Sequence, residues 1–122
     1  ARPRRFLRRT WSRWRGKNYE RRVANLIGGI VVGRSKAIKV DNKFIQINCQ
    51  KPPDILTPMF SVECKYWAKL PVWLDKVMTQ AVRNAPEGLI PLAWVGDREA
   101  KTNYVIMIER DWLDLHGGKT RA

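Results

Sequence analysis

The chain contains few of the residues that build zinc sites and disulfide frameworks. Its 122 residues include a single histidine, His116, and only two cysteines, Cys49 and Cys64. Two cysteines so far apart in the sequence do not indicate a disulfide scaffold or a zinc cluster. We therefore expect both thiols to be reduced and no zinc to be bound.

Long apolar runs are also absent. No stretch of the sequence reaches the length that a membrane-spanning helix needs, and no secretory apolar core follows the basic N-terminus. We expect a soluble, intracellular protein with no membrane partner. A chain of this length fits one domain and is too short for two.

Acidic residues are scarce compared with basic ones. The chain has 24 Lys and Arg against 11 Asp and Glu, a formal net charge of +13 at pH 7. Residues 1–17 hold eight of the basic residues and no acid, and the remaining 16 basic residues still outnumber the acids. An excess of this size attracts polyanions, so nucleic acid is the expected class of partner.

The sequence divides into an arm, a domain and a tail. Residues 1–16 are rich in arginine with interleaved aromatic residues, a composition that suits a disordered arm or a short basic amphipathic helix. We expect an arm that becomes ordered on DNA. Residues 17–116 are expected to form the domain, and residues 117–122 a C-terminal tail.

Periodicity and turn residues predict the elements of that domain. Helical spacing marks three segments, and Gly28-Gly29 and Pro86-Glu87-Gly88 supply the breaks after the first two. Extended segments with turn residues between them mark the strands, including a hairpin around Asp41-Asn42-Lys43. The predicted helices are 17–27, 74–82 and 111–115, and the predicted strands are 30–32, 37–40, 44–48, 54–56, 59–66, 89–95 and 104–108.

One strand brings opposite charges to one face. Side chains alternate along a strand, so Glu63 and Lys65 project together, away from Val62 and Cys64. Asp54 on the adjoining strand can reach the same point. Two carboxylates suit a hard cation such as Mg²⁺, which also binds substrate phosphate, and a lysine can orient water or stabilise developing charge.

A Glu-x-Lys pair alone is weak evidence in a chain this rich in lysine. It also fits an exposed strand with an ordinary ion pair across its face. The nuclease interpretation gains support from a Pro-Asp dipeptide one strand earlier, a helix with an acid before it and a helix after it. Glu20 on the first predicted helix likewise fits either a surface ion pair or a place near the carboxylates.

Pro53-Asp54 followed by Glu63-Cys64-Lys65 resembles the signature of PD-(D/E)xK nucleases. The likeness extends over residues 16–115 to archaeal-type Holliday junction resolvases, which some phages also carry. Its further motifs are Gly16-Lys17, Glu20-Arg21, Gly29 to Arg34, Pro91-Leu92-Ala93-Trp94-Val95 and Tyr104 to Glu109. Two departures are Lys51-Pro52-Pro53 in place of a Ser-rich loop and an extra hairpin over residues 35–50.

The resemblance implies an α/β fold with a restriction-endonuclease-like core, in which a mixed central β-sheet is flanked by helices in a single domain. It implies a homodimer that makes paired nicks in four-way DNA junctions with Mg²⁺ or Mn²⁺, in the host-cell cytoplasm if a phage encodes it. Glu20, Asp54, Glu63 and Lys65 match the catalytic residues. Asp54 and Glu63 match the metal ligands, with the Cys64 backbone carbonyl and a water-mediated Glu20 as further ligands, and Arg34 matches a residue near the cut phosphate.

Other residues are candidates for DNA contact. Basic side chains can bind phosphates. Aromatic side chains beside a basic cleft can stack on splayed bases, although such side chains more often form core or dimer contacts. The six tryptophans indicate an apolar dimer surface, for which the second helix and the last strand are candidates. The remaining DNA-binding candidates are Arg13, Arg15, Lys17, Tyr66, Trp67 and Gln80.

Two rival functions stay open from the sequence. One is another PD-(D/E)xK nuclease that acts on DNA ends, flaps or duplex sites. The other is a non-catalytic architectural protein, in which the basic residues hold phosphates and Glu63 with Lys65 is an ordinary ion pair. Substrate competition separates the first rival from a resolvase, and metal dependence separates the second.

Overall fold

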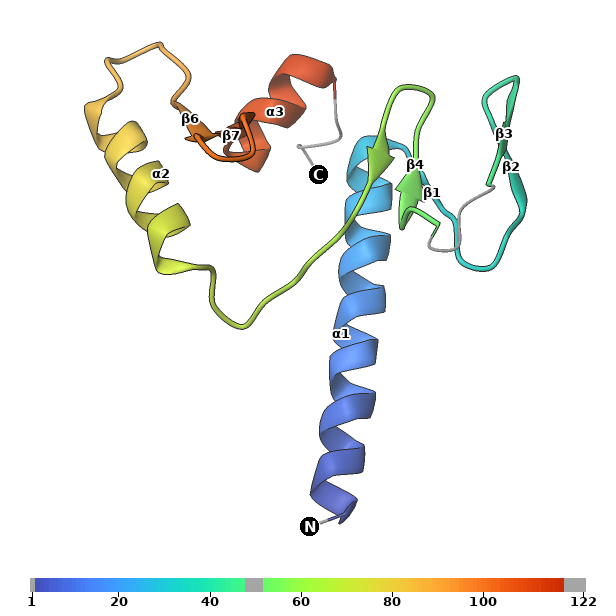
Figure 1. The fold of residues 1–122 in the computed structure, drawn as a ribbon. Coiled ribbons are helices and arrows are strands. Elements are labelled where there is room, and N and C mark those ends of the chain that lie inside the picture. Colours follow the sequence, from blue (N-terminus) through green and yellow to red (C-terminus); the bar gives the residue numbers. More distant parts are fainter. Residues whose placement is uncertain (1, 48–51, 118–122) are drawn as a thin grey trace. The chain divides into compact units, whose positions relative to one another are not determined.

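The protein is an α/β protein with three helices and antiparallel sheets among its described residues (Figure 1). This computed structural model describes residues 2–47 and 52–117, with side chains from Arg15 onward. These residues fall into two compact units, one that ends at Tyr66 and one that begins at Trp67. The order of elements, α-β-β-β-β-β-α-β-β-α, is the predicted order.

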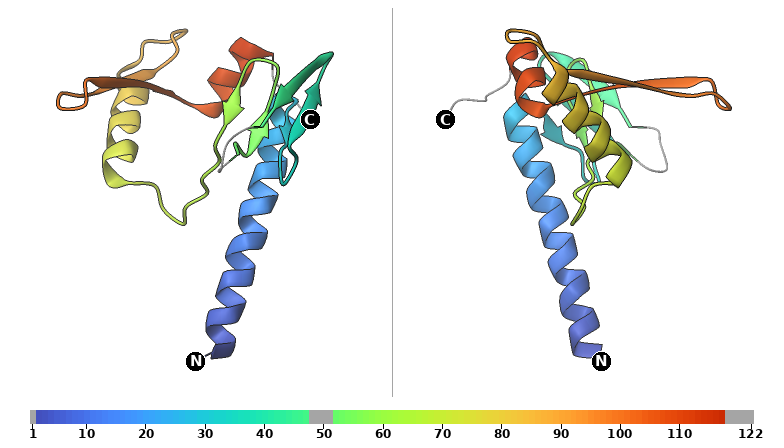
Figure 2. Two further views of the ribbon diagram at one scale, coloured as in Figure 1. Left: turned by 45° about the vertical axis from the view of Figure 1, so that its right-hand side comes forward. Right: turned by 90° about the vertical axis from the view of Figure 1, so that its left-hand side faces the viewer.

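The first helix, α1, spans Arg2–Ile27 without a break, and both views of Figure 2 show it as one continuous rod. Residues 2–16, which were predicted to form an arm, are part of this helix in the described backbone, and their ordering on DNA stays a prediction. Pro3 lies in the first turn, where its missing N–H breaks no helical hydrogen bond. Gly16 costs about 1 kcal/mol relative to alanine, which is too little to end a helix of this length.

Two glycines end α1 and turn the chain into the sheet. Gly28 has φ +69°, and the Gly29 N–H donates to the Ala24 carbonyl at 2.8 Å, which closes the helix in a Schellman motif. Strand β1 (Ile30–Val31) follows at once and lies beside the end of α1. It pairs antiparallel with β4 (Ile55–Leu56), which pairs antiparallel with β5 (Ser61–Val62).

Prolines limit the length of this three-stranded sheet. A strand over Met59 to Tyr66 was predicted, but β5 covers only Ser61–Val62. The Asp54 N–H still donates to the Val62 carbonyl at 3.0 Å. Pro52 and Pro53 come before it and have no N–H to continue the ladder.

The predicted hairpin is present as β2 (Ala37–Val40) and β3 (Lys43–Gln46), which turn through Asp41 at φ +54°. Its inner side chains complete the core of the first unit. Burying an aliphatic side chain of this size contributes about 1.5–3 kcal/mol, so this cluster is what anchors β4. The buried cluster consists of Val32, Ile38, Val40 and Leu56, with Ile45 and Ile47 packed against it.

The second unit contains α2 (Val72–Asn84), β6 (Leu92–Asp97), β7 (Thr102–Met107) and α3 (Glu109–His116). Strands β6 and β7 form an antiparallel hairpin, and α2 lies against β6. Strand β6 extends to Asp97 and β7 begins at Thr102. Both strands therefore include residues of the segment from Gly96 to Asn103, which was predicted to be a polar connection. The Asp97 carboxylate accepts the Glu99 and Ala100 N–H groups, which folds the turn.

The predicted single mixed sheet is not what the described strands form. They make three separate sheets, β1-β4-β5, β2-β3 and β6-β7, and every pairing is antiparallel. The pairs β2–β3, β4–β5 and β6–β7 join chain neighbours through short connections, which favour antiparallel pairing, whereas β1 and β4 are separated in the chain by the β2–β3 hairpin. In the part of the chain that the structure covers, no helix is long and apolar enough to cross a membrane.

Candidate active site

The backbone holds Asp54 at the centre of the three-stranded sheet. Its N–H donates to the Val62 carbonyl and its carbonyl accepts from the Val32 N–H, each at 3.0 Å. Its side chain is held as well, because Oδ2 accepts the Cys64 N–H at 2.8 Å. The residue that the sequence singled out as a metal ligand is therefore fixed on both sides before strand β4 begins.

The carboxyl group of Glu20, on α1, lies close to those of Asp54 and Glu63. Burial, with the nearby Asp54 and Glu63 carboxylates, raises the pKa of Glu20 above its ordinary value of 4.5, while Lys17 opposes the shift. Glu20 therefore gives up its proton less readily than an ordinary glutamate does.

Glu63, Cys64 and Lys65 continue from β5 along the same edge. Glu63 and Lys65 are exposed while Val62 and Cys64 are half-buried, so the predicted alternation of faces is present. Burial, followed by the charges of Asp54, Glu20 and Glu63, raises the pKa of the Cys64 thiol above its ordinary value of 9.0. Three carboxyl groups from three segments thus act on one thiol, which places them in one acidic cluster.

The chemistry of this cluster fits a hard divalent cation. A cation can offset the repulsion between carboxylates that lie this close, and carboxylate oxygens are the ligands that Mg²⁺ prefers. Among the described residues no group of three or more His, Cys, Asp or Glu side chains is arranged to hold a metal ion. Mg²⁺ commonly binds only one or two protein carboxylates and completes its coordination shell with water and substrate phosphate. The carboxylates of Glu20 and Asp54 are therefore enough protein ligands.

Comparisons of the chain with protein-family models, with curated proteins and with solved structures found no match. The resemblance to resolvases therefore rests on the motifs alone. What the cluster does has to be argued from its own geometry and charge.

Several predicted DNA contacts lie in the same unit as the acidic cluster. Arg15 and Lys17 are exposed on α1, and Arg34 is exposed in the turn that follows β1. The Arg13 side chain lies outside the described residues. Tyr66 is the last residue of this unit, with 63% of its surface exposed.

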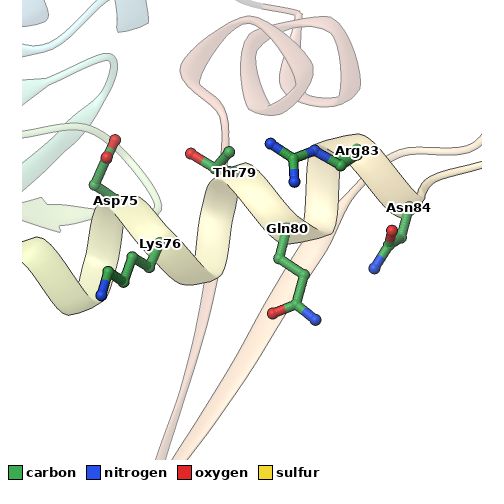
Figure 3. A pocket seen from close by; sticks show the side chains of 6 residues that line it. All are labelled: Asp75, Lys76, Thr79, Gln80, Arg83 and Asn84. Atoms are coloured by element: carbon green, nitrogen blue, oxygen red, sulfur yellow. The ribbon is translucent and has the colours of Figure 1, made fainter.

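Two further candidates, Trp67 and Gln80, belong to the second unit. The sequence placed Gln80 on the helix after the Glu-x-Lys segment, and it does lie on α2, exposed. Figure 3 shows its side chain among those of the other five residues that line a hollow on α2. It lines an open hollow of about 450 Å³ along this one helix, together with Lys76 and Asn84 among others. Its proposed part in DNA binding stays a prediction.

Sequence reasoning missed one group beside the cluster. Tyr19 had been taken only as an apolar position of the first helix, yet its ring stacks on that of Tyr66, with centroids 4.5 Å apart and ring planes 13° apart. The Arg22 guanidinium lies over the Tyr19 ring, 6.0 Å from its centroid. Arg15, Asn18, Tyr19 and Arg22 recur at helical spacing, which is the signal that could have revealed the group.

The raised pKa of Glu20 gives the protein a testable pH dependence. Because the folded state binds the Glu20 proton more tightly than the unfolded chain does, stability falls as the pH rises from 4.5 through the raised pKa. Glu20→Gln keeps the size of the side chain and removes the charge. We expect its Tm in EDTA to exceed that of the wild type by roughly 1–3 °C at pH 7.5 and to equal it at pH 4.

Circular dichroism melts at the two pH values measure this difference. Glu87→Gln is the matched control, because Glu87 is exposed in the loop after α2, and it should leave Tm unchanged at both pH values. An equal Tm difference at pH 4 and pH 7.5 would mean that Glu20 holds no proton of this kind.

Proposed function

We propose that the protein is a metal-dependent DNA endonuclease of the PD-(D/E)xK type that resolves four-way junctions. The observation that carries the proposal is the convergence of Glu20, Asp54 and Glu63 near Cys64, where the Cys64 N–H fixes the Asp54 carboxylate at 2.8 Å. Carboxyl groups repel one another when ionised, so their convergence is unfavourable unless a proton or a cation lies between them. Such a cluster is typical of sites where a cation meets a phosphate.

Each residue of the cluster has a distinct part in the proposed reaction. Asp54 and Glu63, with Glu20 directly or through water, would hold the cation, and the Cys64 carbonyl stays a further candidate ligand. When bound, Mg²⁺ or Mn²⁺ supplies an activated water and neutralises charge on the phosphate. The Cys64 N–H keeps Asp54 in one orientation. Lys65, exposed on the same face as Glu63, offers a positive charge to the phosphate oxygens.

Charge supports DNA as the substrate. The acidic cluster is local, whereas the whole chain carries +13, and residues 2–17 of the α1 helix include eight basic residues and no acid. A helix with this composition can follow a phosphate backbone through many ionic contacts, which makes binding fall steeply with salt. The acidic residues near α1 are then the ones that belong to the proposed catalytic cluster.

Exposed apolar side chains in the second unit support the proposed homodimer. A monomer gains nothing from leaving large apolar residues in water, and extended apolar surface marks an interaction site. The predicted dimer elements, α2 and the last strand, both contribute such residues. The exposed set includes Val72, Trp73 and Val82 on α2 and Leu92, Trp94, Tyr104 and Val105 on the β6–β7 hairpin.

The test of the proposed function is a gel assay on a labelled four-way junction and a linear duplex of matching sequence, each with Mg²⁺ and with EDTA. We expect paired nicks in the junction, no cutting of the duplex, and no cutting of either substrate in EDTA. Sedimentation of the same sample should give the mass of a dimer, since paired nicks need two sites.

The other outcomes separate the rivals. Metal-dependent cutting of both substrates would keep the nuclease and remove the resolvase. Tight binding of both without cutting would favour the architectural protein.

A further inference from the structure

Beside the acidic cluster lies an open pocket that mixes aromatic and basic side chains. Its volume is about 310 Å³, near the lower end of the range for pockets that hold small ligands. All of its lining residues belong to the first unit, four of them from one face of α1. They are Arg15, Asn18, Tyr19, Arg22 and Tyr66.

The two tyrosines of this pocket form a stacking platform. Their rings lie nearly parallel with centroids 4.5 Å apart, and Arg22 lies over the Tyr19 ring. A stacked pair that serves only to stabilise a fold is normally buried, because burial provides most of its energy. Tyr66 is instead 63% exposed although its ring stacks on that of Tyr19, so part of the residue's surface is open to a ligand.

The pocket adjoins the acidic cluster through both of its tyrosines. Tyr19 precedes Glu20 on α1, and Tyr66 directly follows Lys65. A strand whose phosphate reaches the cluster can therefore place an adjacent nucleotide at the tyrosines. Arg15 and Arg22 carry positive charge to the same pocket, which suits the sugar-phosphate part of that nucleotide.

We propose that this pocket binds one unpaired nucleotide of the DNA strand that is cut, with its base stacked on Tyr66 and its phosphate near Arg15 and Arg22. The proposal rests on the proposed function, because it takes the ligand to be part of the DNA substrate. Within a continuous duplex both faces of each base are covered by neighbouring bases, so only an unpaired or extruded base can offer a face to a ring. The substrate class is therefore DNA with nucleotides that are unpaired, or easily unpaired, beside the cut, as at a branch point.

The test measures binding without cleavage. Fluorescence anisotropy in EDTA would give the Kd of the full chain for a labelled DNA hairpin duplex with a single-stranded tail of six thymidines, and for the same hairpin with a blunt end. We expect the tailed hairpin to bind about 10-fold more tightly. Tyr66→Ala should remove most of that preference, since one base stacked on an aromatic ring contributes a factor of roughly 5 to 100.

Two control variants make the test specific. Tyr66→Phe keeps the ring and should keep the preference for the tail. Phe44→Ala removes an aromatic side chain that is 69% exposed on β3 and should leave both Kd values unchanged. Because Tyr66 is exposed, its replacement by alanine is not expected to unfold the protein, and equal circular dichroism spectra would check this.

The outcomes distinguish this proposal from the proposed function. Equal Kd values for tailed and blunt hairpins, or a tail preference that survives in Tyr66→Ala, would overturn the pocket proposal even if junctions are cut. A tail preference that depends on Tyr66 would support the pocket even if no DNA is cut in Mg²⁺, a result that would overturn the nuclease.

Discussion

Asp54→Asn and Lys65→Ala are each expected to lower the rate of junction cleavage by at least about 10²–10³-fold while DNA binding changes by less than about 3-fold. Asp54→Asn keeps the shape of the side chain and its contact with the Cys64 N–H but removes the negative charge that would hold a cation. Lys65→Ala removes the positive charge beside Glu63. Neither change alters the eight basic residues within residues 2–17, so most phosphate contacts remain.

Single-turnover cleavage with saturating protein measures the rate, and anisotropy in EDTA measures the binding. The matched controls are Asp75→Asn and Lys76→Ala, which remove the same two kinds of charge from exposed positions on α2. Both controls should cleave at the wild-type rate. Wild-type cleavage by Asp54→Asn and Lys65→Ala would place the chemistry elsewhere in the chain.

Gly29→Ala is expected to lower Tm by about 5–15 °C and to slow cleavage about 10-fold or more at temperatures where the variant is folded. A Cβ at Gly29 would lie 2.5 Å from Ile55 Cγ2 and 3.2 Å from the Leu56 carbonyl oxygen. Ile55 is fully buried, so it has no space to move away. The clash with the added Cβ is relieved when α1 moves away from β4. That movement also carries Glu20 away from Asp54.

Gly16→Ala is the control on the same helix. Nothing lies within 4 Å of a Cβ built at Gly16, and alanine is the better helix former, so this variant should be as stable as the wild type or more stable by up to about 1 kcal/mol. Thermal melts and single-turnover rates measure both variants. A Gly29→Ala protein with wild-type Tm and rate would show that α1 and β4 need no such close approach.

The order of elements could be predicted because local signals were strong throughout. Gly28 and Gly29 end α1, Asp41 and Asn42 turn the β2–β3 hairpin, and residues 86–88 separate α2 from β6. The structure also brings Glu20 close to Asp54, while the roles that the motif gives these two residues stay a prediction. Residues far apart in the chain came together because α1 packs on β1 and β1 pairs with β4.

The errors have physical causes that short-range patterns do not contain. The arginine-rich start was interpreted as an arm because its charges repel, but it also suits a helix, since Gly16 is the one glycine and there is no proline between Pro3 and Gly28. Strand β5, which was predicted to continue to Tyr66, ends early because the Cys64 N–H donates to the side chain of Asp54 and not to a backbone carbonyl. The Tyr19–Tyr66 stack joins residues 47 positions apart, so no local pattern could reveal it.

Binding of Mn²⁺ to the DNA-free protein tests the central claim most directly, since it asks whether the Glu20–Asp54 pair is a cation site. Calorimetric titrations at pH 6 in buffers with different ionisation enthalpies would count the bound ions and the released protons. We predict at least one Mn²⁺ per chain, bound with proton release because Glu20 gives up its proton, and weakened at least about 10-fold in Asp54→Asn. Wild-type protein that binds no Mn²⁺, or Asp54→Asn that binds it as tightly as the wild type, would contradict the account.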